Sequence, residues 1–147
     1  LLTLKNYLEK HPEISALTSY NVPISNNLID KLVYGFFNIF ILNAFQKINP
    51  VAVGTFIYVK KEVFNKVKGF DNNFNYGEDA NFVKRVAKSG YKFKVLRKPP
   101  IYFSVRRLNE EGRIKFFAKS IYLGIFYILR DKNFSSSKIK YDFGKHQ

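Results

Sequence analysis

The stretch GFDNNFNYGEDANFVKRVAKSG, residues 69–90, combines a turn, two adjacent carboxylates and an amphipathic helix. Gly69 gives the backbone freedom that a turn needs, and the Asp and Asn residues that follow favour turns because their side chains hydrogen-bond to their own backbone. From Gly77 onward, apolar residues recur at helical spacing until the final glycine, which predicts a helix with a glycine cap. Glu78 and Asp79 therefore fall in the first turn of this helix, where the helix dipole tends to keep carboxylates ionised.

The basic residues of this helix, Lys84, Arg85 and Lys88, fall between its apolar positions and are expected to face solvent. Acidic residues are common in the first turn of helices for dipole reasons alone. Taken by itself, the Glu78–Asp79 pair therefore favours ordinary helix-start chemistry over a functional site.

The residues before this stretch predict a buried strand followed by a short helix. Residues 51–59, VAVGTFIYV, form an almost continuous apolar run of the kind found in strands that are buried on both faces. Gly54 interrupts the run; a glycine there either lets a ligand or another backbone approach closely or marks a bulge. Residues 60–67 then predict a short helix that leads into the turn.

The N-terminal part predicts a helix over residues 1–10, which Pro12 ends, and a short strand over residues 14–20. A loop follows, in which Asn26 or Asn27 is suited to cap the next helix. That helix, residues 28–45, is the most apolar of the chain, but its apolar residues do not keep to one face. It is too short and too interrupted to span a bilayer, so it is expected at a membrane interface or against further protein, with ordinary core as the alternative.

The C-terminal part alternates apolar and basic residues over positions 91–96, which predicts a half-exposed strand near a sheet edge. Pro99 and Pro100 predict an extended kink before a second short strand over residues 101–105. An apolar amphipathic helix is expected over residues 113–130. We divide the chain into a domain of residues 1–107, a segment of residues 108–130 that includes this possible membrane-interface helix, and a basic polar tail of residues 131–147.

The composition limits the classes of function. The 147 residues carry a formal charge of +14, which predicts attraction to a phosphorylated ligand, a lipid surface or nucleic acid. Without cysteine, the chain has no disulfide, thiolate nucleophile or Cys-ligated zinc. His11 and His146 are far apart in the sequence and form no metal-binding motif. The chain starts with Leu and contains no Met, so we expect it to be a piece of a longer protein.

The motifs occur in an order that is similar to a known enzyme family. The strand and helix GTFIYVKKEVF (residues 54–64), the turn VKGFD (residues 67–71), the Glu78–Asp79 pair and a basic helix carrying Arg85 resemble the C-terminal, acceptor-side half of family 2 glycosyltransferases. The resemblance covers residues 1–107 and implies an α/β fold, with part of a GT-A-type mixed sheet flanked by helices.

The resemblance also implies roles for particular residues. Asp79 corresponds to the catalytic base that takes the proton from the acceptor hydroxyl, and Glu78 would orient Asp79 or the acceptor. The acceptor side would be lined by Gly54, Gly69, Phe70 and Asp71. Arg106 and Arg107 would neutralise the nucleotide diphosphate leaving group, although a solvated basic loop explains them equally well.

The family holds Mg²⁺ or Mn²⁺ through a D-x-D motif in its nucleotide-binding half, and this sequence has no D-x-D. A hard divalent cation needs clustered oxygen ligands, so no metal is expected on this chain alone. The expected activity is the acceptor-binding and catalytic-base part of an inverting hexosyltransferase in cell-envelope polysaccharide synthesis, inactive without the other half. Its partners would be a nucleotide-sugar, a glycan or lipid-linked acceptor, and the cytoplasmic face of an anionic membrane.

Two functions from other classes remain open. A basic chain rich in Tyr and Phe could bind nucleic acid, although its aromatic residues lie mostly within apolar periodic runs, which favours core positions. A non-catalytic module on a membrane surface would explain the charge and the apolar helices.

Overall fold

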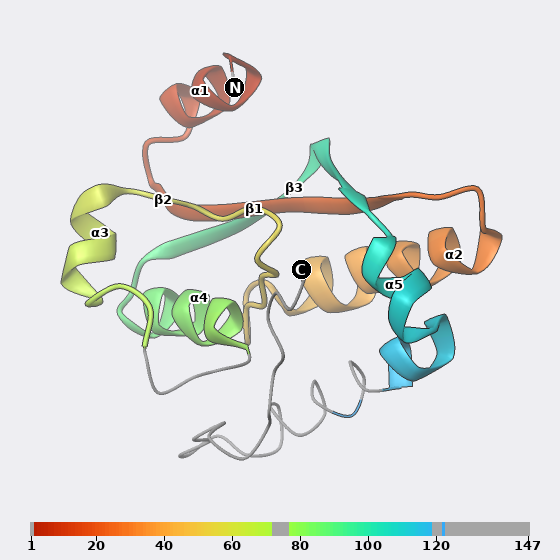
Figure 1. Ribbon diagram of the computed structural model, residues 1–147. Coiled ribbons are helices and arrows are strands. Elements are labelled where there is room, and N and C mark those ends of the chain that lie inside the picture. The colour runs from red at the N-terminus through yellow and green to blue at the C-terminus, as the bar shows by residue number, and fades with distance from the viewer. Residues whose placement is uncertain (1, 72–76, 119–121, 123–147) are drawn as a thin grey trace, which may run out of the picture.

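The computed structural model describes residues 2–71, 77–118 and 122, which form a mixed sheet with helices on both faces (Figure 1). The central strand is β1 (Ile14–Ile24); β2 (Tyr58–Val59) pairs with it antiparallel on one side and β3 (Lys92–Ser104) parallel on the other. This arrangement confirms the predicted fold class, a mixed α/β sheet flanked by helices, and is consistent with part of a GT-A-type fold.

The larger core lies between the sheet and the helices α3 (Lys61–Lys66), α4 (Glu78–Lys88) and η1 (Phe37–Asn43). Helix α4 turns its apolar stripe, Phe82, Val83 and Val86, toward the sheet, and all three side chains are fully buried. Burial of each such side chain stabilises the fold by about 1.5–3 kcal/mol. The core therefore fixes the orientation of α4, whose first turn carries Glu78 and Asp79.

A smaller core lies on the other face of the sheet, beneath α1 (Leu2–Lys10) (Figure 1). Leu4, Tyr7 and Leu8 of this helix pack against a buried cluster of Ile14, Leu17 and Leu96. The helix predicted over residues 1–10 is confirmed.

The apolar helix predicted over residues 28–45 starts as α2 (Leu28–Phe36) and continues directly as the π-helix η1. Asn27 is the N-cap: its side-chain oxygen accepts a hydrogen bond from the backbone N–H of Ile29 at 2.8 Å. Within the described residues, no helix has both the length and the hydrophobicity needed to cross a membrane.

The prediction of a strand over residues 51–59 is mostly wrong. Only Tyr58–Val59 is a strand, and it is a half-buried edge strand, because a turn at Gly54 and Thr55 redirects the chain before it. The apolar residues of the run are used differently: Ala52 is buried in the larger core, and Phe56 packs against the smaller one. An apolar run predicts burial, but by itself it does not predict a strand.

The other two strands are longer than predicted. Strand β1 continues through Pro23 to Ile24, where β2 no longer pairs with it, so a proline without a backbone N–H is tolerated. Strand β3 continues through Pro99 and Pro100, where two strands and a kink were predicted. The prolines lie in a register shift, because Ser19 pairs with Leu96 and Asn21 pairs with Ile101.

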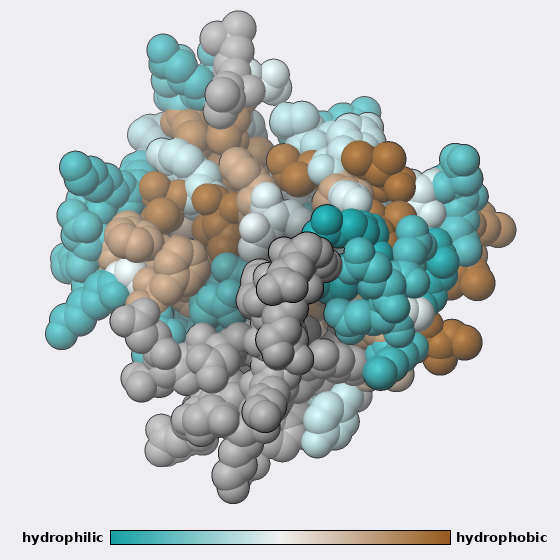
Figure 2. Space-filling view, viewed as in Figure 1, coloured by the Kyte–Doolittle hydropathy of each residue, from teal (hydrophilic) through white to brown (hydrophobic). Residues whose placement is uncertain are grey.

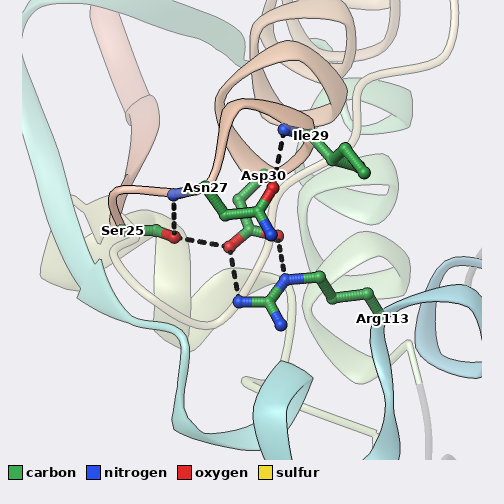
Figure 3. A network of polar contacts seen from close by, with 5 residues as sticks. All are labelled: Ser25, Asn27, Ile29, Asp30 and Arg113. Atoms are coloured by element: carbon green, nitrogen blue, oxygen red, sulfur yellow. Dashed lines mark hydrogen bonds and ion pairs between the residues drawn. The ribbon is translucent and has the colours of Figure 1, made fainter.

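The chain leaves β3 through α5 (Arg106–Glu111) and a helical segment of residues 113–118. The predicted domain boundary after residue 107 therefore falls inside α5. Arg113 ties this part of the chain to α2, because its guanidinium group binds the carboxylate of Asp30 (Figure 3). Apart from Tyr122, the rest of the helix predicted to residue 130 and the predicted tail lie outside the described residues.

Candidate active site

The carboxylate of Asp79 lies against the exposed turn that contains Gly54. The backbone N–H of Gly54 donates a hydrogen bond to this carboxylate. A Cβ atom added at Gly54 would lie 2.7 Å from Oδ2 of Asp79, so the carboxylate would have to move to make room for a side chain. The sequence offered a ligand, another backbone or a bulge as the reason for this glycine; in the structure the group that approaches it is the side chain of Asp79.

The environment of Asp79 changes its acidity. Partial burial and the adjacent charge of Glu78 raise the pKa of Asp79 to about 6, although the hydrogen bond from Gly54 opposes the change. Burial and the charge of Glu78 thus act against the helix dipole, which was expected to keep this carboxylate ionised. At neutral pH the carboxylate is still mostly ionised, but it is a stronger base than an ordinary aspartate.

The turn around Gly69 confirms the predicted need for glycine. Lys68 and Gly69 both have a φ of 61°, and a Cβ at Gly69 would lie 2.9 Å from the ring of Phe64. Phe70 is 43% exposed, and its ring packs 4.7 Å from that of Phe82 on α4. The turn is therefore held against the helix that carries Asp79.

Arg85 also holds this turn, which corrects the expectation that it faces solvent. From α4, its guanidinium group donates hydrogen bonds to the backbone carbonyls of Val67 and Gly69. Its Nε donates to Oδ1 of Asn81 at 2.8 Å. Arg85 thus satisfies carbonyl groups that follow α3. Asp71, which comes directly after this turn, is partly buried.

A buried polar network behind Gly54 was not predicted. Asn38 of η1 pairs with the backbone of Asn21 in β1, with N···O distances of 2.9 and 2.8 Å. The hydroxyl of Thr55 donates to the side-chain oxygen of Asn21. Through Thr55, this network anchors the turn that meets Asp79. The sequence signal was an asparagine inside the most apolar helix, which we interpreted only as an interruption.

Arg106 and Arg107 lie in the first turn of α5, directly after β3 as predicted, but on a different element from Asp79. Both side chains are exposed, and they form ion pairs one helical turn along, with Glu110 at 3.5 Å and Glu111 at 3.9 Å. Exposed pairs of this kind contribute little to stability. The guanidinium groups are therefore accessible to an anion.

The described residues do not contain a cluster of three His, Cys, Asp or Glu side chains that could hold a metal ion. A hollow of about 230 Å³ lies between α1 and β3, lined in part by Tyr7, Leu96 and Pro99. In Figure 1, α1 lies across the sheet from α4, so this hollow does not belong to the site around Asp79.

Residues 39–111 match a family model described as the N-terminal domain of galactosyltransferase. The match covers just under half of the chain and includes every candidate site residue from Gly54 to Arg107. It supports a glycosyltransferase-like domain with a role in sugar transfer, but it does not single out family 2. No curated protein and no solved structure matches the chain significantly.

Proposed function

We propose that this chain provides the acceptor-binding and catalytic-base part of an inverting glycosyltransferase. The observation that carries the proposal is the carboxylate of Asp79, held by the N–H of Gly54 beside an exposed turn and on a helix fixed by the core. In the reaction, Asp79 takes the proton of the acceptor hydroxyl while that oxygen bonds to the anomeric carbon. The bond from this carbon to the diphosphate breaks, and the nucleoside diphosphate leaves.

The properties of Asp79 suit this task. A base works best when its pKa lies near the working pH, because it must be ionised and still attract a proton. Partial burial and the charge of Glu78 move the pKa of Asp79 toward this range. We assign Glu78 to tuning and orienting Asp79, and Gly54, Gly69, Phe70 and Asp71 to the acceptor side.

The remaining roles are proposals for the complete enzyme. Arg106 and Arg107 would balance the charge of the departing diphosphate, for which their exposed position on α5 is suitable. Mg²⁺ or Mn²⁺ would neutralise the diphosphate of a bound donor, but the described residues do not form a site for it, so we assign no ligand here. The acceptor would be a glycan or lipid-linked hydroxyl of a family 2 reaction in cell-envelope polysaccharide synthesis.

The test is Asp79→Asn in the protein that contains this chain. Because the matched family is described as a galactosyltransferase, UDP-galactose is the first donor to assay, followed by other nucleotide-activated hexoses, with Mn²⁺ and a panel of sugar acceptors. We expect the rate of UDP release during transfer to fall about 10²–10⁴-fold, as for loss of a general base. Calorimetry should find donor binding unchanged.

Two further variants make this test specific. Glu62→Gln removes an acidic side chain from the first turn of α3 and should leave the rate unchanged. Gly54→Ala should lower the rate, because its Cβ displaces the Asp79 carboxylate. A rate within threefold of wild type for Asp79→Asn would refute the assignment.

The pH profile tests the role of Glu78. The rate should rise with pH through an apparent pKa of about 6, as Asp79 loses its proton. Glu78→Gln removes the like charge, so it should move this limb to lower pH. An acid limb that does not move in Glu78→Gln would show that another group controls the rate.

A further inference from the structure

We propose that the outer face of α2 and η1 docks this protein on the surface of an anionic lipid bilayer. The outer face consists of six apolar residues on the solvent side of these helices: Leu28, Ile29, Leu32, Phe36, Ile39 and Phe40. Each is at least half exposed, from 51% for Phe40 to 67% for Leu28. The inference depends on this face and not on the transferase proposal.

The helical spacing places the outer face on one side of the helices. The residues that point the other way, Asp30, Asn38 and Leu42, are buried against the rest of the protein. The rings of Phe36 and Phe40 stack on the solvent side with centroids 4.5 Å apart. Part of this apolar surface is visible as brown at the right-hand edge of Figure 2, over α2. A contiguous exposed apolar face of this kind marks an interaction site.

The charges around the outer face select an anionic partner. Between Ile24 and Ile48 the sequence has one carboxylate, Asp30, which is fully buried and bound by Arg113. The charged residues exposed to solvent in this segment are Lys31 and Lys47. This segment therefore combines apolar side chains with accessible positive charge, and none of its own carboxylates is accessible to repel an anionic headgroup.

A bilayer fits this combination better than the other anionic or apolar partners. A second copy of the chain also carries +14, so a dimer through this face would bring like charges together. Nucleic acid requires many phosphate contacts and flat stacking groups, whereas this segment exposes only Lys31 and Lys47 beside mostly aliphatic side chains. An amphipathic helix with lysines and Phe, Leu and Ile lies in the plane of the lipid headgroups.

The experiment is sedimentation with vesicles of phosphatidylcholine containing 30% phosphatidylglycerol, compared with pure phosphatidylcholine. We expect binding to the anionic vesicles, weakened when NaCl is raised from about 0.1 to 0.5 M. Phe40→Glu should weaken this binding at least tenfold. Leu32→Ser, which adds no charge, should also weaken it, by about fivefold.

The matched control is Tyr102→Glu, which adds the same charge at another exposed aromatic residue. Phe103 contacts Tyr34 of α2, so Tyr102, its neighbour in β3, points to the opposite face of the sheet. Tyr102→Glu should weaken binding to the anionic vesicles less than threefold. Equal losses for Phe40→Glu and Tyr102→Glu, or no binding by wild type, would overturn the proposal. A wild-type dimer that Phe40→Glu converts to a monomer would also overturn it and assign the face to a second copy.

The vesicle assay contains no sugar donor, so its outcome is separate from that of the transferase test. Circular dichroism melts of each variant check folding, and these exposed positions should change the melting temperature little.

Discussion

Asp30 and Asp79 occupy similar positions, each in the first turn of a helix, yet the structure gives them opposite properties. Asp30 is fully buried, and Arg113 contacts both of its oxygens, at 2.9 and 3.2 Å, while Ser25 donates a hydrogen bond at 2.6 Å (Figure 3). Asp79 is only partly buried, beside Glu78, and accepts a hydrogen bond from the N–H of Gly54.

The difference shows that the partner of a carboxylate decides its role more than its place on the helix does. Burial would raise the pKa of Asp30, but the hydrogen bonds from Arg113 and Ser25 and the charge of Arg113 outweigh it, so the pKa is lowered. Burial and a like charge raise the pKa of Asp79 to about 6. Asp30 is therefore a structural anion, and Asp79 is available for proton transfer.

The largest effect should come from Arg113→Met, which leaves the buried carboxylate of Asp30 without its cation. Removing one partner of a buried ion pair costs about 3–5 kcal/mol, and we expect about 3 kcal/mol because the Arg113 side chain is 31% exposed. Urea unfolding at pH 7 measures this loss. As a control, Arg106→Met breaks an exposed pair with Glu110 and should cost less than about 0.5 kcal/mol.

The double variant Asp30→Asn with Arg113→Met distinguishes the cost of the unpaired Asp30 charge from the cost of the lost Arg113 packing contacts. It removes the unpaired charge, so it should be more stable than Arg113→Met alone. If both variants lose the same free energy, the cost comes from lost contacts of Arg113 and not from the carboxylate of Asp30.

A smaller effect, of opposite sign, should appear in the pH dependence of stability. Because the folded state raises the pKa of Asp79 from 3.8 to about 6, it binds this proton more tightly than the unfolded state does. The resulting stability is present below about pH 4 and is lost as the pH rises through about 6. Asp30, whose pKa is lowered, contributes stability above its ordinary pKa and loses it as the pH falls.

Asp79→Asn isolates this contribution. One pKa unit corresponds to about 1.4 kcal/mol, and discounting for the partly exposed site leaves on the order of 2 kcal/mol. Relative to wild type, the free energy of unfolding of Asp79→Asn should therefore increase by about that amount between pH 4 and pH 8. A difference that is constant with pH would mean that Asp79 has an ordinary pKa.

The sequence predicts a role for Asp79, but it does not predict the ion pair of Asp30. Asp79 is predicted as a functional residue because its neighbours in the chain, Glu78 and the helix that follows, form a local motif. The ion pair of Asp30 joins residues 83 positions apart, and no local pattern connects them. The prediction for Arg85 was wrong for the same reason. Its spacing on α4 indicated a side chain in solvent, but the side chain binds carbonyl groups 16 and 18 residues earlier in the chain.

The helices and strands were also predicted correctly where the sequence signal was local. Helices α1 and α4 were predicted because their apolar spacing is a local property. The strand over residues 51–59 was wrong because pairing with β1 decides which part of an apolar run becomes a strand, and only Leu17 and Ala16 have partners there. The turn at Gly54 is governed by Asp79, which lies 25 positions later.

The smallest effect concerns how the two helices begin. Helix α2 has a side-chain cap, Asn27, whereas the N-cap residue of α4 is Gly77, which has a φ of 76° and no side chain to cap the helix. Asn27→Ala should cost about 1 kcal/mol in urea unfolding, and Asn26→Ala, at the other asparagine that the sequence offered as a cap, should cost almost nothing. Because the Asn27 side chain caps only a backbone N–H group, the free energy lost in Asn27→Ala should be independent of pH between 4 and 8. The contact between Asn27 and the Ser25 hydroxyl is made by the backbone N–H of Asn27, which the alanine variant keeps. A loss that changes with pH would therefore mean that the Asn27 side chain interacts with a titrating group.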